Sequence, residues 1–253
     1  MIDVRDLGFR HSLAAPWLFS GLSFSLQQGK TLALLGRNGN GKTTLLKCLA
    51  GLLAPGAGSV RCSGAIGYVP QSFTPAFGYS VFDVVLMGRA RHVGLFSKPT
   101  AIDRQQARGA LDLIGLGSLS QRSVTTLSGG ERQLVLIARA LASEANILLL
   151  DEPASALDFH NQALMLSTLR RLTLQRGLTI VMTTHEPTHA LEIADRVVLL
   201  HGSGSGEEGP VETMCTERKL SDLYGISMKR LDYCASKGPS AHIVANYSSI
   251  AGL

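Results

Sequence analysis

Gly36-Arg37-Asn38-Gly39-Asn40-Gly41-Lys42-Thr43-Thr44 lies between an apolar run at residues 31–35 and a run with helical spacing at residues 42–50. A strand, a glycine-rich loop and a helix in this order form the context of a phosphate-binding loop. The glycines let backbone N–H groups approach phosphate oxygens, and the N-terminal end of the helix attracts the same anion. We therefore expect this stretch to bind nucleotide phosphates, with Lys42 at the β- and γ-phosphates and the Thr43 hydroxyl at Mg²⁺. The alternative is a glycine-rich turn that binds nothing.

Length and composition are those of a globular α/β protein. With 253 residues and 45% hydrophobic content, the chain can bury the core of one large domain, with or without a small helical subdomain. No apolar run approaches the roughly 18 to 20 residues of a membrane helix. The first residues lack the profile of a signal peptide, so we expect a cytosolic location. The cysteines, at 48, 62, 215 and 234, lack metal-ligand or paired spacing, which predicts reduced thiols.

The formal net charge of +5 and the pI near 9.2 raise the question of nucleic-acid binding. Lysine and arginine are spread along the chain rather than gathered in runs, so we expect no nucleic-acid partner.

The pattern of apolar residues predicts most elements of the fold. Residues 2–7 and 22–26 alternate with period 2, which predicts an antiparallel strand pair. Helical spacing at 80–90 and 101–115 predicts a helical insertion over about 72–127. Strands at 147–151, 179–183 and 196–200 alternate with helices at 130–143, 159–176 and 187–194, which predicts a parallel sheet. We expect residues 202–210 to form a loop, and the sequence after about Lys229 indicates little.

The strand at 147–150 ends in Asp151-Glu152-Pro153, the form of a Walker B strand. Ligands of α/β sheets bind at the carboxyl ends of the strands, where we expect Asp151 to hold Mg²⁺ through water. Because side chains of an extended segment alternate, Glu152 can take another role and polarise the attacking water. The alternative is a pair of solvated carboxylates.

Leu127-Ser128-Gly129-Gly130-Glu131-Arg132-Gln133 precedes a long apolar helix. Ser128 is a natural N-cap, and Glu131 complements the dipole of the first turn. With two glycines exposing backbone N–H groups, this helix start predicts a second anion site. Taken alone, it could equally be an ordinary capped helix.

Together these motifs resemble those of ATP-binding cassette (ABC) ATPases, over roughly residues 1–225. The matching segments are Gly36 to Thr43 (Walker A), Gln71 (Q-loop), Leu127 to Gln133 (signature), Leu148 to Pro153 (Walker B), Ser155 to Asp158 (D-loop) and His185 (switch histidine). The resemblance implies an α/β P-loop NTPase fold with a RecA-like mixed or parallel sheet core, an antiparallel β-subdomain and a helical subdomain. It implies an ATPase domain at 1–225, with about 72–127 extending into the helical subdomain, and a short C-terminal extension at 226–253.

The resemblance also implies a mechanism. A head-to-tail homodimer would trap two ATP molecules with Mg²⁺, each between the Walker A loop of one copy and Ser128, Gly129 and Gly130 of the other. Gln71 would sense the γ-phosphate and Mg²⁺, Asp158 would couple the two sites, and His185 would bind the γ-phosphate and orient the water. Without the family, His185 is an unremarkable histidine at a strand end.

The chain departs from the family pattern at three places. His11 occupies the position at which a tyrosine often stacks on adenine, and Phe9 precedes it by two residues. Either ring could stack. Leu134 replaces a common arginine after the signature, and Ala154 replaces a common threonine before the D-loop.

The short interval between Walker A and the signature, and the single cassette, favour a transporter subunit that acts on a separate permease. Residues 68–71, 79–89 and 110–116 look like the bacterial importer group for iron-siderophores, haem and cobalamin. Residues 72–78 and 93–99, with Gln133-Leu134, are similar to its molybdate and tungstate branch. The implied partners are a second copy of the chain, two permease copies and, indirectly, a periplasmic or lipid-anchored solute-binding protein. The implied location is the cytoplasmic face of the inner membrane.

Two questions stay open. Phe73, Phe77 and Tyr79 could line a groove for a helix of the permease, or they could be subdomain core. A soluble ABC ATPase that remodels a complex outside transport is the alternative function.

Overall fold

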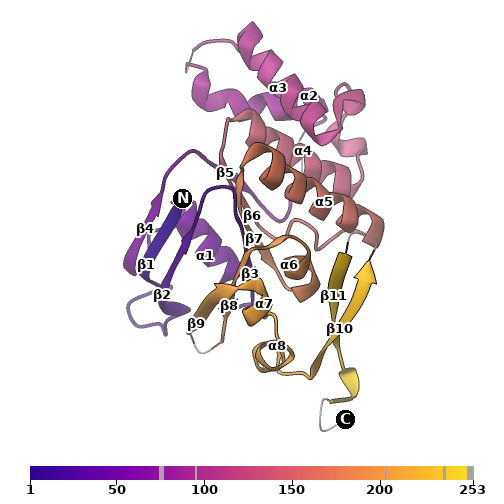
Figure 1. Ribbon diagram of the computed structural model, residues 1–253. Coiled ribbons are helices and arrows are strands. Elements are labelled where there is room, and N and C mark those ends of the chain that lie inside the picture. The colour runs from indigo at the N-terminus through magenta and orange to yellow at the C-terminus, as the bar shows by residue number, and fades with distance from the viewer. Residues whose placement is uncertain (74–76, 95, 203, 236–237, 250–253) are drawn as a thin grey trace. The chain divides into compact units, whose positions relative to one another are not determined.

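The computed structural model describes residues 1–73, 77–94, 96–202, 204–235 and 238–249 (Figure 1). The chain divides into two compact units. The first comprises Met1–Ser63 and Thr179–Leu253, and the second comprises Gly64–Leu178. The α/β class expected from the sequence is confirmed, since strands and helices build both units.

An antiparallel sheet in the first unit has the order β2-β1-β4. Its strands are β1 (Ile2–Phe9), β2 (Phe19–Leu26) and β4 (Ala57–Cys62). In β2 the apolar residues Phe19, Leu22, Phe24 and Leu26 are buried and the residues between them are exposed, so the predicted strand pair is confirmed. Strand β4 was not predicted, because Ala-Gly-Ser-Val-Arg-Cys has no clear alternation.

The first unit also holds the parallel strands β7 (Thr179–Thr184), β3 (Thr31–Leu35) and β8 (Arg196–Leu200), neighbours in that order. All residues of β3 and β7 are buried, as expected for strands covered on both faces. Helix α1 (Lys42–Leu49) contacts β7, and α6 (Pro187–Ile193) contacts β3. The strand prediction for this region is confirmed, and the carboxyl end of β3 leads directly into the glycine-rich loop.

The prediction of a loop at 202–210 was wrong for the second half of this segment. Residues Gly206–Pro210 form strand β9, antiparallel to β8. The backbone of β9 forms its hydrogen bonds with the edge of β8. The Gly-Glu-Glu-Gly-Pro composition of β9 does not by itself predict a strand. Residue 203 lies outside the described residues. Helix α7 (Val211–Met214) then contacts both strands, and α8 (Glu217–Tyr224) follows.

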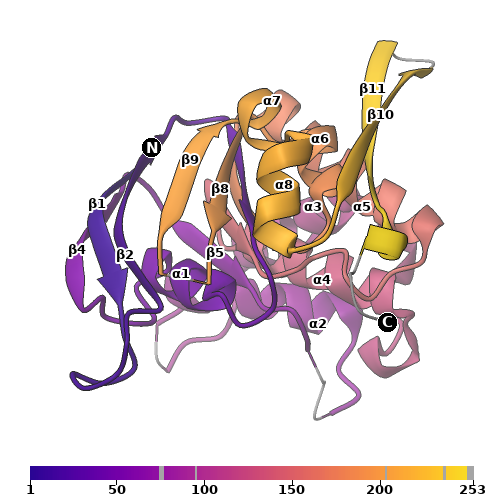
Figure 2. The same ribbon diagram turned by 90° about the horizontal axis from the view of Figure 1, so that it is seen from below.

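A hairpin occupies the region about which the sequence indicated little. Strands β10 (Met228–Ala235) and β11 (Gly238–Ala245) pair in antiparallel register, and Figure 2 shows α8 next to the start of β10. The backbone N–H of Ile243 donates to Thr188 Oγ1 at 3.2 Å, which fastens β11 to α6. The proposed boundary at 225/226 stays a prediction.

In the second unit, β5 (Ile66–Val69) and β6 (Ile147–Leu150) pair in parallel. Figure 1 shows α2 and α3 of this unit next to α4. Their bounds agree with the predicted helices: α2 (Val81–Leu86) with a 3₁₀ helix at Met87–His92, α3 (Ala101–Ile114), α4 (Gly129–Ala142) and α5 (Phe159–Arg176).

A buried arginine joins three of these elements. Arg89, in the 3₁₀ helix, donates from Nε to Asp103 of α3 at 3.0 Å and from Nη1 to the carbonyl of Ala142, the last residue of α4, at 2.8 Å. Its Nη1 also lies 3.0 Å from Glu144 Oε1. Because a buried guanidinium is stable only when its donors are paired, these contacts fix the 3₁₀ helix to α3 and α4.

No helix in the described part of the chain is both long and apolar enough to cross a membrane.

Candidate functional site

The backbone of the loop after β3 requires its glycines. Gly39 and Gly41 have φ angles of +87° and +91°, in the left-handed region that favours glycine. A Cβ at Gly36 would lie 2.7 Å from the carbonyl oxygen of Leu200, which is closer than real Cβ contacts allow. The loop therefore keeps its backbone tightly curved before α1, the arrangement that presents N–H groups to a phosphate.

Lys42 lies inside this loop. Its side chain is buried, and its Nζ donates to the carbonyls of Gly36 at 2.8 Å and Arg37 at 3.4 Å. Gly41 gives α1 no side-chain cap, and the first turn contains no acidic residue. A cation and an uncapped helix start at the same place fit a bound phosphate. Thr43 and Thr44, both half-buried, follow in the first turn.

The connection between β1 and β2 lies against the phosphate loop, since a Cβ at Gly41 would be only 2.8 Å from Leu18 Cγ. His11, in this connection, is exposed, and its ring meets Phe9 edge-on with centroids 5.4 Å apart. Trp17, which the sequence analysis did not name, is a third candidate for the ring that stacks on adenine. It is partly exposed, with the Arg10 guanidinium 4.6 Å from its ring centroid. As the only tryptophan of the chain, six residues after His11, it was the available signal.

His185 directly follows β7 and is partly exposed, with Nε2 3.9 Å from Glu186 Oε1. A second histidine, His189, was missed. It is buried, with Nδ1 3.3 Å from Thr184 Oγ1 and Nε2 3.2 Å from Glu186 Oε2. Burial is the main cause that lowers the pKa of His189, which favours the neutral ring. Its contacts with Thr184 and Glu186 give His189 a structural role at the end of β7.

Asp151 follows β6 and is buried. Its backbone N–H donates to the carbonyl of Val69 at 2.9 Å, which holds the end of β6 beside β5. Tyr68 was not predicted as part of the site. Burial, together with the charge of Asp151 and a hydrogen bond to it, raises the pKa of Tyr68 to about 12. The neutral phenol therefore orients the Asp151 carboxylate.

Glu152 has a φ of +44°, a left-handed conformation that is uncommon for any residue other than glycine. The extended geometry assumed from the sequence ends at Leu150, so strand alternation does not set the direction of Glu152. Gln71 Nε2 donates to Glu152 Oε2 at 3.1 Å. The structure thus brings together two of the predicted catalytic side chains, from segments 81 residues apart.

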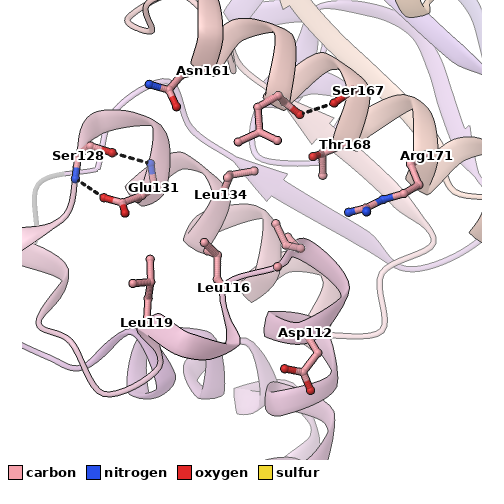
Figure 3. Close-up of a pocket in the computed structure, with 13 residues that line it drawn as sticks. Asp112, Leu116, Leu119, Ser128, Glu131, Leu134, Asn161, Ser167, Thr168 and Arg171 are labelled. Atoms are coloured by element: carbon pink, nitrogen blue, oxygen red, sulfur yellow. Dashed lines mark hydrogen bonds between the residues drawn. The ribbon is translucent and has the colours of Figure 1, made fainter.

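The predicted cap of α4 is confirmed. The backbone N–H of Ser128 donates to Glu131 Oε2 at 2.7 Å, and the N–H of Glu131 donates to Ser128 Oγ at 3.2 Å (Figure 3). The first of these bonds is the main cause that lowers the pKa of Glu131, which keeps the capping carboxylate ionised. Gly129 is exposed, and a Cβ there would meet no atom within 4 Å. The helix start therefore faces open space.

Two cavities flank this helix start. One, of about 820 Å³, opens on the side of Ser128 and Glu131 and reaches Arg171 of α5, as Figure 3 shows. The other, of about 260 Å³, lies on the side of Gly129 and is also lined by Gln71 and Glu152.

Asp158 is the N-cap of α5. Its carboxylate accepts from the backbone N–H of Asn161 at 2.8 Å and from Asn161 Nδ2 at 2.9 Å. The backbone hydrogen bond is the main cause that lowers the pKa of Asp158. A Cβ at Gly130 would lie 3.3 Å from the Asn161 side chain, so the starts of α4 and α5 touch. Coupling between two ATP sites through Asp158 stays a prediction.

The donor set fits a nucleotide-bound Mg²⁺ rather than a metal held by protein alone. The described residues contain no cluster of three or more His, Cys, Asp and Glu side chains able to hold a metal ion. Mg²⁺ in nucleotide sites is usually held by phosphates and water with one or two protein ligands. That Thr43, Asp151 and Gln71 supply these ligands stays a prediction.

The three aromatic residues predicted for a groove or a core separate in the structure. Phe77 and Tyr79 are 66% and 44% exposed and meet edge-on at 5.8 Å, so the core alternative is wrong for both. Tyr79 lines a groove of about 590 Å³ with Met87, Ala90 and Val93. Phe73 lines the smaller cavity near Gln71 instead. Residues 74–76 and 95, within the stretches compared with known importers, lie outside the described residues.

Comparison with known proteins gives consistent matches. A family model described as "ABC transporter" matches residues 19–155, more than half of the chain. The molybdate import ATP-binding protein MolC of Haemophilus influenzae is 42% identical and covers 98% of both chains. A probable iron chelatin transport ATP-binding protein of Helicobacter pylori is 35% identical over 91% of this chain and 95% of that protein. A solved structure, assigned to a metal-chelate type ABC transporter in an inward-facing conformation, has a TM-score of 0.93, 41% identity and 98% coverage of both chains.

Proposed function

Because this chain belongs to the ABC transporter family of ATP-binding proteins, we propose that it is the ATP-hydrolysing subunit of a bacterial importer. The observation that carries the proposal is the 42% identity to a molybdate import ATP-binding protein over 98% of both chains. The proposed solute is a metal oxyanion such as molybdate or tungstate, or a metal chelate such as an iron-siderophore, haem or cobalamin.

The residues of the site divide the chemistry among them. Lys42 and the backbone N–H groups of residues 36–44 bind the β- and γ-phosphates, and Thr43, Asp151 and Gln71 hold Mg²⁺. Glu152 polarises the attacking water, and His185 binds the γ-phosphate. His11 is our first choice for the ring that stacks on adenine, with Phe9 as the alternative. When magnesium ATP is bound, its phosphates carry the negative charge that these groups balance.

The active form is a head-to-tail homodimer. Its support is the exposed helix start at Ser128 and Gly129, a capped N-terminus with open space in front of it. A helix start of this kind favours an anion, and the γ-phosphate on a second copy supplies one. Each ATP would then be bound by residues 36–44 of one copy and residues 128–130 of the other, with Asp158 coupling the two sites.

A permease is the second partner. The groove lined by Tyr79, Met87, Ala90 and Val93 combines apolar walls with one acidic residue, Asp83, a surface suited to the apolar face of a short helix. We propose that a cytoplasmic helix of the permease occupies it. The dimer would serve two permease subunits at the cytoplasmic face of the inner membrane, and a solute-binding protein would act through the permease.

Co-purification with ATPase measurement tests the proposal. Tagged protein extracted in detergent should retain a polytopic membrane protein, and the complex should hydrolyse ATP faster when the loaded solute-binding protein is added. Retention of a soluble partner instead, with hydrolysis insensitive to any solute-binding protein, would favour the alternative of a soluble ABC ATPase that remodels another complex.

A further inference from the structure

The phosphate loop contacts the end of β8 at two places. Asn40 Nδ2 donates to the carbonyl oxygen of Leu200, the last residue of β8, at 2.8 Å, although the two residues are 160 positions apart. At the start of the loop, Gly36 lies so close to the same oxygen that a Cβ there would be 2.7 Å from it. Leu200 itself is fully buried. One fixed point of the sheet therefore touches the loop at both ends of residues 36–40.

The segment between these two contacts is a tight turn that contains a glycine. The backbone N–H of Asn40 donates to the carbonyl of Arg37 at 3.2 Å, and Gly39 has a φ of +87°. Ordering a glycine costs more conformational entropy than ordering any other residue. Backbone N–H groups bind an anion more tightly when their orientation is set before the anion arrives, because that cost is then not charged to binding. A contact that holds this turn in place should thus strengthen phosphate binding.

The Asn40 side chain is suited to this task by its chemistry. Its amide nitrogen is a donor and its amide oxygen an acceptor, so only the nitrogen can pair with a carbonyl oxygen. The amide oxygen lies on the side of the turn that follows β8, since a Cβ at Gly202 would be 3.6 Å from Asn40 Oδ1. The side chain is half-buried, which protects the hydrogen bond to Leu200 from competition with water. An alanine at position 40 would end at Cβ and could not form that bond.

We propose that Asn40 is a positioning residue for the nucleotide: its amide fixes the phosphate loop to the end of β8, so that the backbone N–H groups of residues 36–44 keep the orientation that phosphate oxygens require. This inference rests on the proposed function, in which those N–H groups bind the β- and γ-phosphates. Asn40 takes part in no covalent step. Because it acts on the loop in the same way in the ground state and the transition state, it sets the affinity for nucleotide and not the rate of hydrolysis.

Two substitutions test the proposal. Asn40→Ala removes the amide, and Asn40→Leu keeps the branched shape of the side chain without its donor. Both should weaken the binding of MgADP, which is not hydrolysed, about three- to tenfold, the range expected for the loss of one hydrogen bond. Magnesium pyrophosphate, which has the phosphates but no base, should be weakened by the same factor. In steady-state ATPase assays the KM for ATP should rise by that factor, with kcat unchanged within about twofold.

Ser143→Ala is the matched control. Ser143 is also half-buried, and its Oγ donates to the carbonyl of Ala140 at 2.7 Å, in the other unit of the chain. It should bind MgADP as the wild type does. The Tm of the nucleotide-free protein should fall by a similar amount in Ser143→Ala and Asn40→Ala, so that affinity alone separates them. Partial unfolding of the Asn40 variants at the assay temperature would assign Asn40 to stability and overturn the proposal.

Three binding results would also overturn it. They are wild-type affinity in Asn40→Ala, wild-type affinity in Asn40→Leu, which would show that shape suffices, and a loss for MgADP without a loss for pyrophosphate, which would place the effect at the base or ribose. Failure of the proposed function has a different signature: the wild type would not bind MgADP, or Lys42→Ala would bind it equally well. If the wild type binds MgADP, Lys42→Ala does not, and the Asn40 variants match the wild type, this inference alone fails.

Discussion

Gly129→Ala should separate stability from ATP-driven dimerisation. Gly129 is the first residue of α4, and a Cβ there would meet no atom within 4 Å. Replacing a helical glycine by alanine stabilises a helix by roughly 0.5–1 kcal/mol, chiefly because the unfolded chain loses less entropy. For a chain of this size that corresponds to a rise of about 1 to 4 °C in Tm, with the lower end expected at the first helical position.

The same methyl group should abolish dimerisation if residues 128–130 approach the partner's γ-phosphate. Anion binding at a helix start depends on close approach of the backbone N–H groups, and a methyl group on the open face prevents that approach. We expect Gly129→Ala, combined with Glu152→Gln, to elute as a monomer with ATP under conditions in which Glu152→Gln alone elutes as a dimer.

Gly109→Ala is the matched control. Gly109 lies inside α3, and a Cβ there would also meet no atom within 4 Å. It should raise Tm by an equal or greater amount and leave ATP-dependent dimerisation unchanged. Gel filtration and thermal unfolding measure both quantities on the same samples. An ATP-dependent dimer formed by Gly129→Ala would refute the assignment of this helix start to the partner's nucleotide.

Three further predictions concern hydrolysis, docking and pH. Glu152→Gln should keep ATP affinity but slow hydrolysis by at least about 100-fold, within the range expected for loss of a general base; wild-type turnover would exclude Glu152 from that role. Phe77→Ala should weaken retention of the permease while changing the free energy of unfolding by less than about 0.5 kcal/mol, because the side chain is 66% exposed; Leu174→Ala, exposed on α5 of the same unit, should retain the permease. Burial lowers the pKa of His189 below its usual 6.5, so below that pH the unfolded chain binds more protons and the free energy of unfolding falls as pH falls. His189→Gln should flatten this decline in denaturant titrations between pH 7 and 5.5, and an unchanged slope would contradict the assignment.

The parts of the fold that sequence predicted well depend on local chemistry. Residues 31–49 form a buried strand, a glycine loop and a helix, and the apolar run, the glycines and the helical spacing that predict them lie within the segment itself. The Ser128–Glu131 capping box likewise depends on residues three apart. Such features leave a readable pattern because the same few residue types are the ones able to adopt the geometry.

The parts that it missed depend on distant partners. Strand β9 exists because the edge of β8 accepts it, and the hairpin of β10 and β11 is fastened to α6 by a side chain more than fifty residues away. The same holds in the site. Nothing local indicates that Tyr68 holds Asp151, that Asn161 faces Gly130, or that Gln71 binds Glu152. These contacts follow from tertiary packing, to which a single sequence gives no direct access.

Arg89 has a mechanical consequence. The 3₁₀ helix that contains Arg89 also contributes Met87 and Ala90 to the groove. The Arg89 guanidinium donates a hydrogen bond to the carbonyl of Ala142, the last residue of α4. Helix α4 has 14 residues and is therefore a stiff rod about 21 Å long. Pressure applied at the groove would be delivered at the far end of that rod, at Ser128 and Gly129. We therefore expect a force applied at the groove to move α4 as a rigid body through its contact with Arg89. Ser128 and Gly129 would then be displaced, and the groove would not simply deform locally.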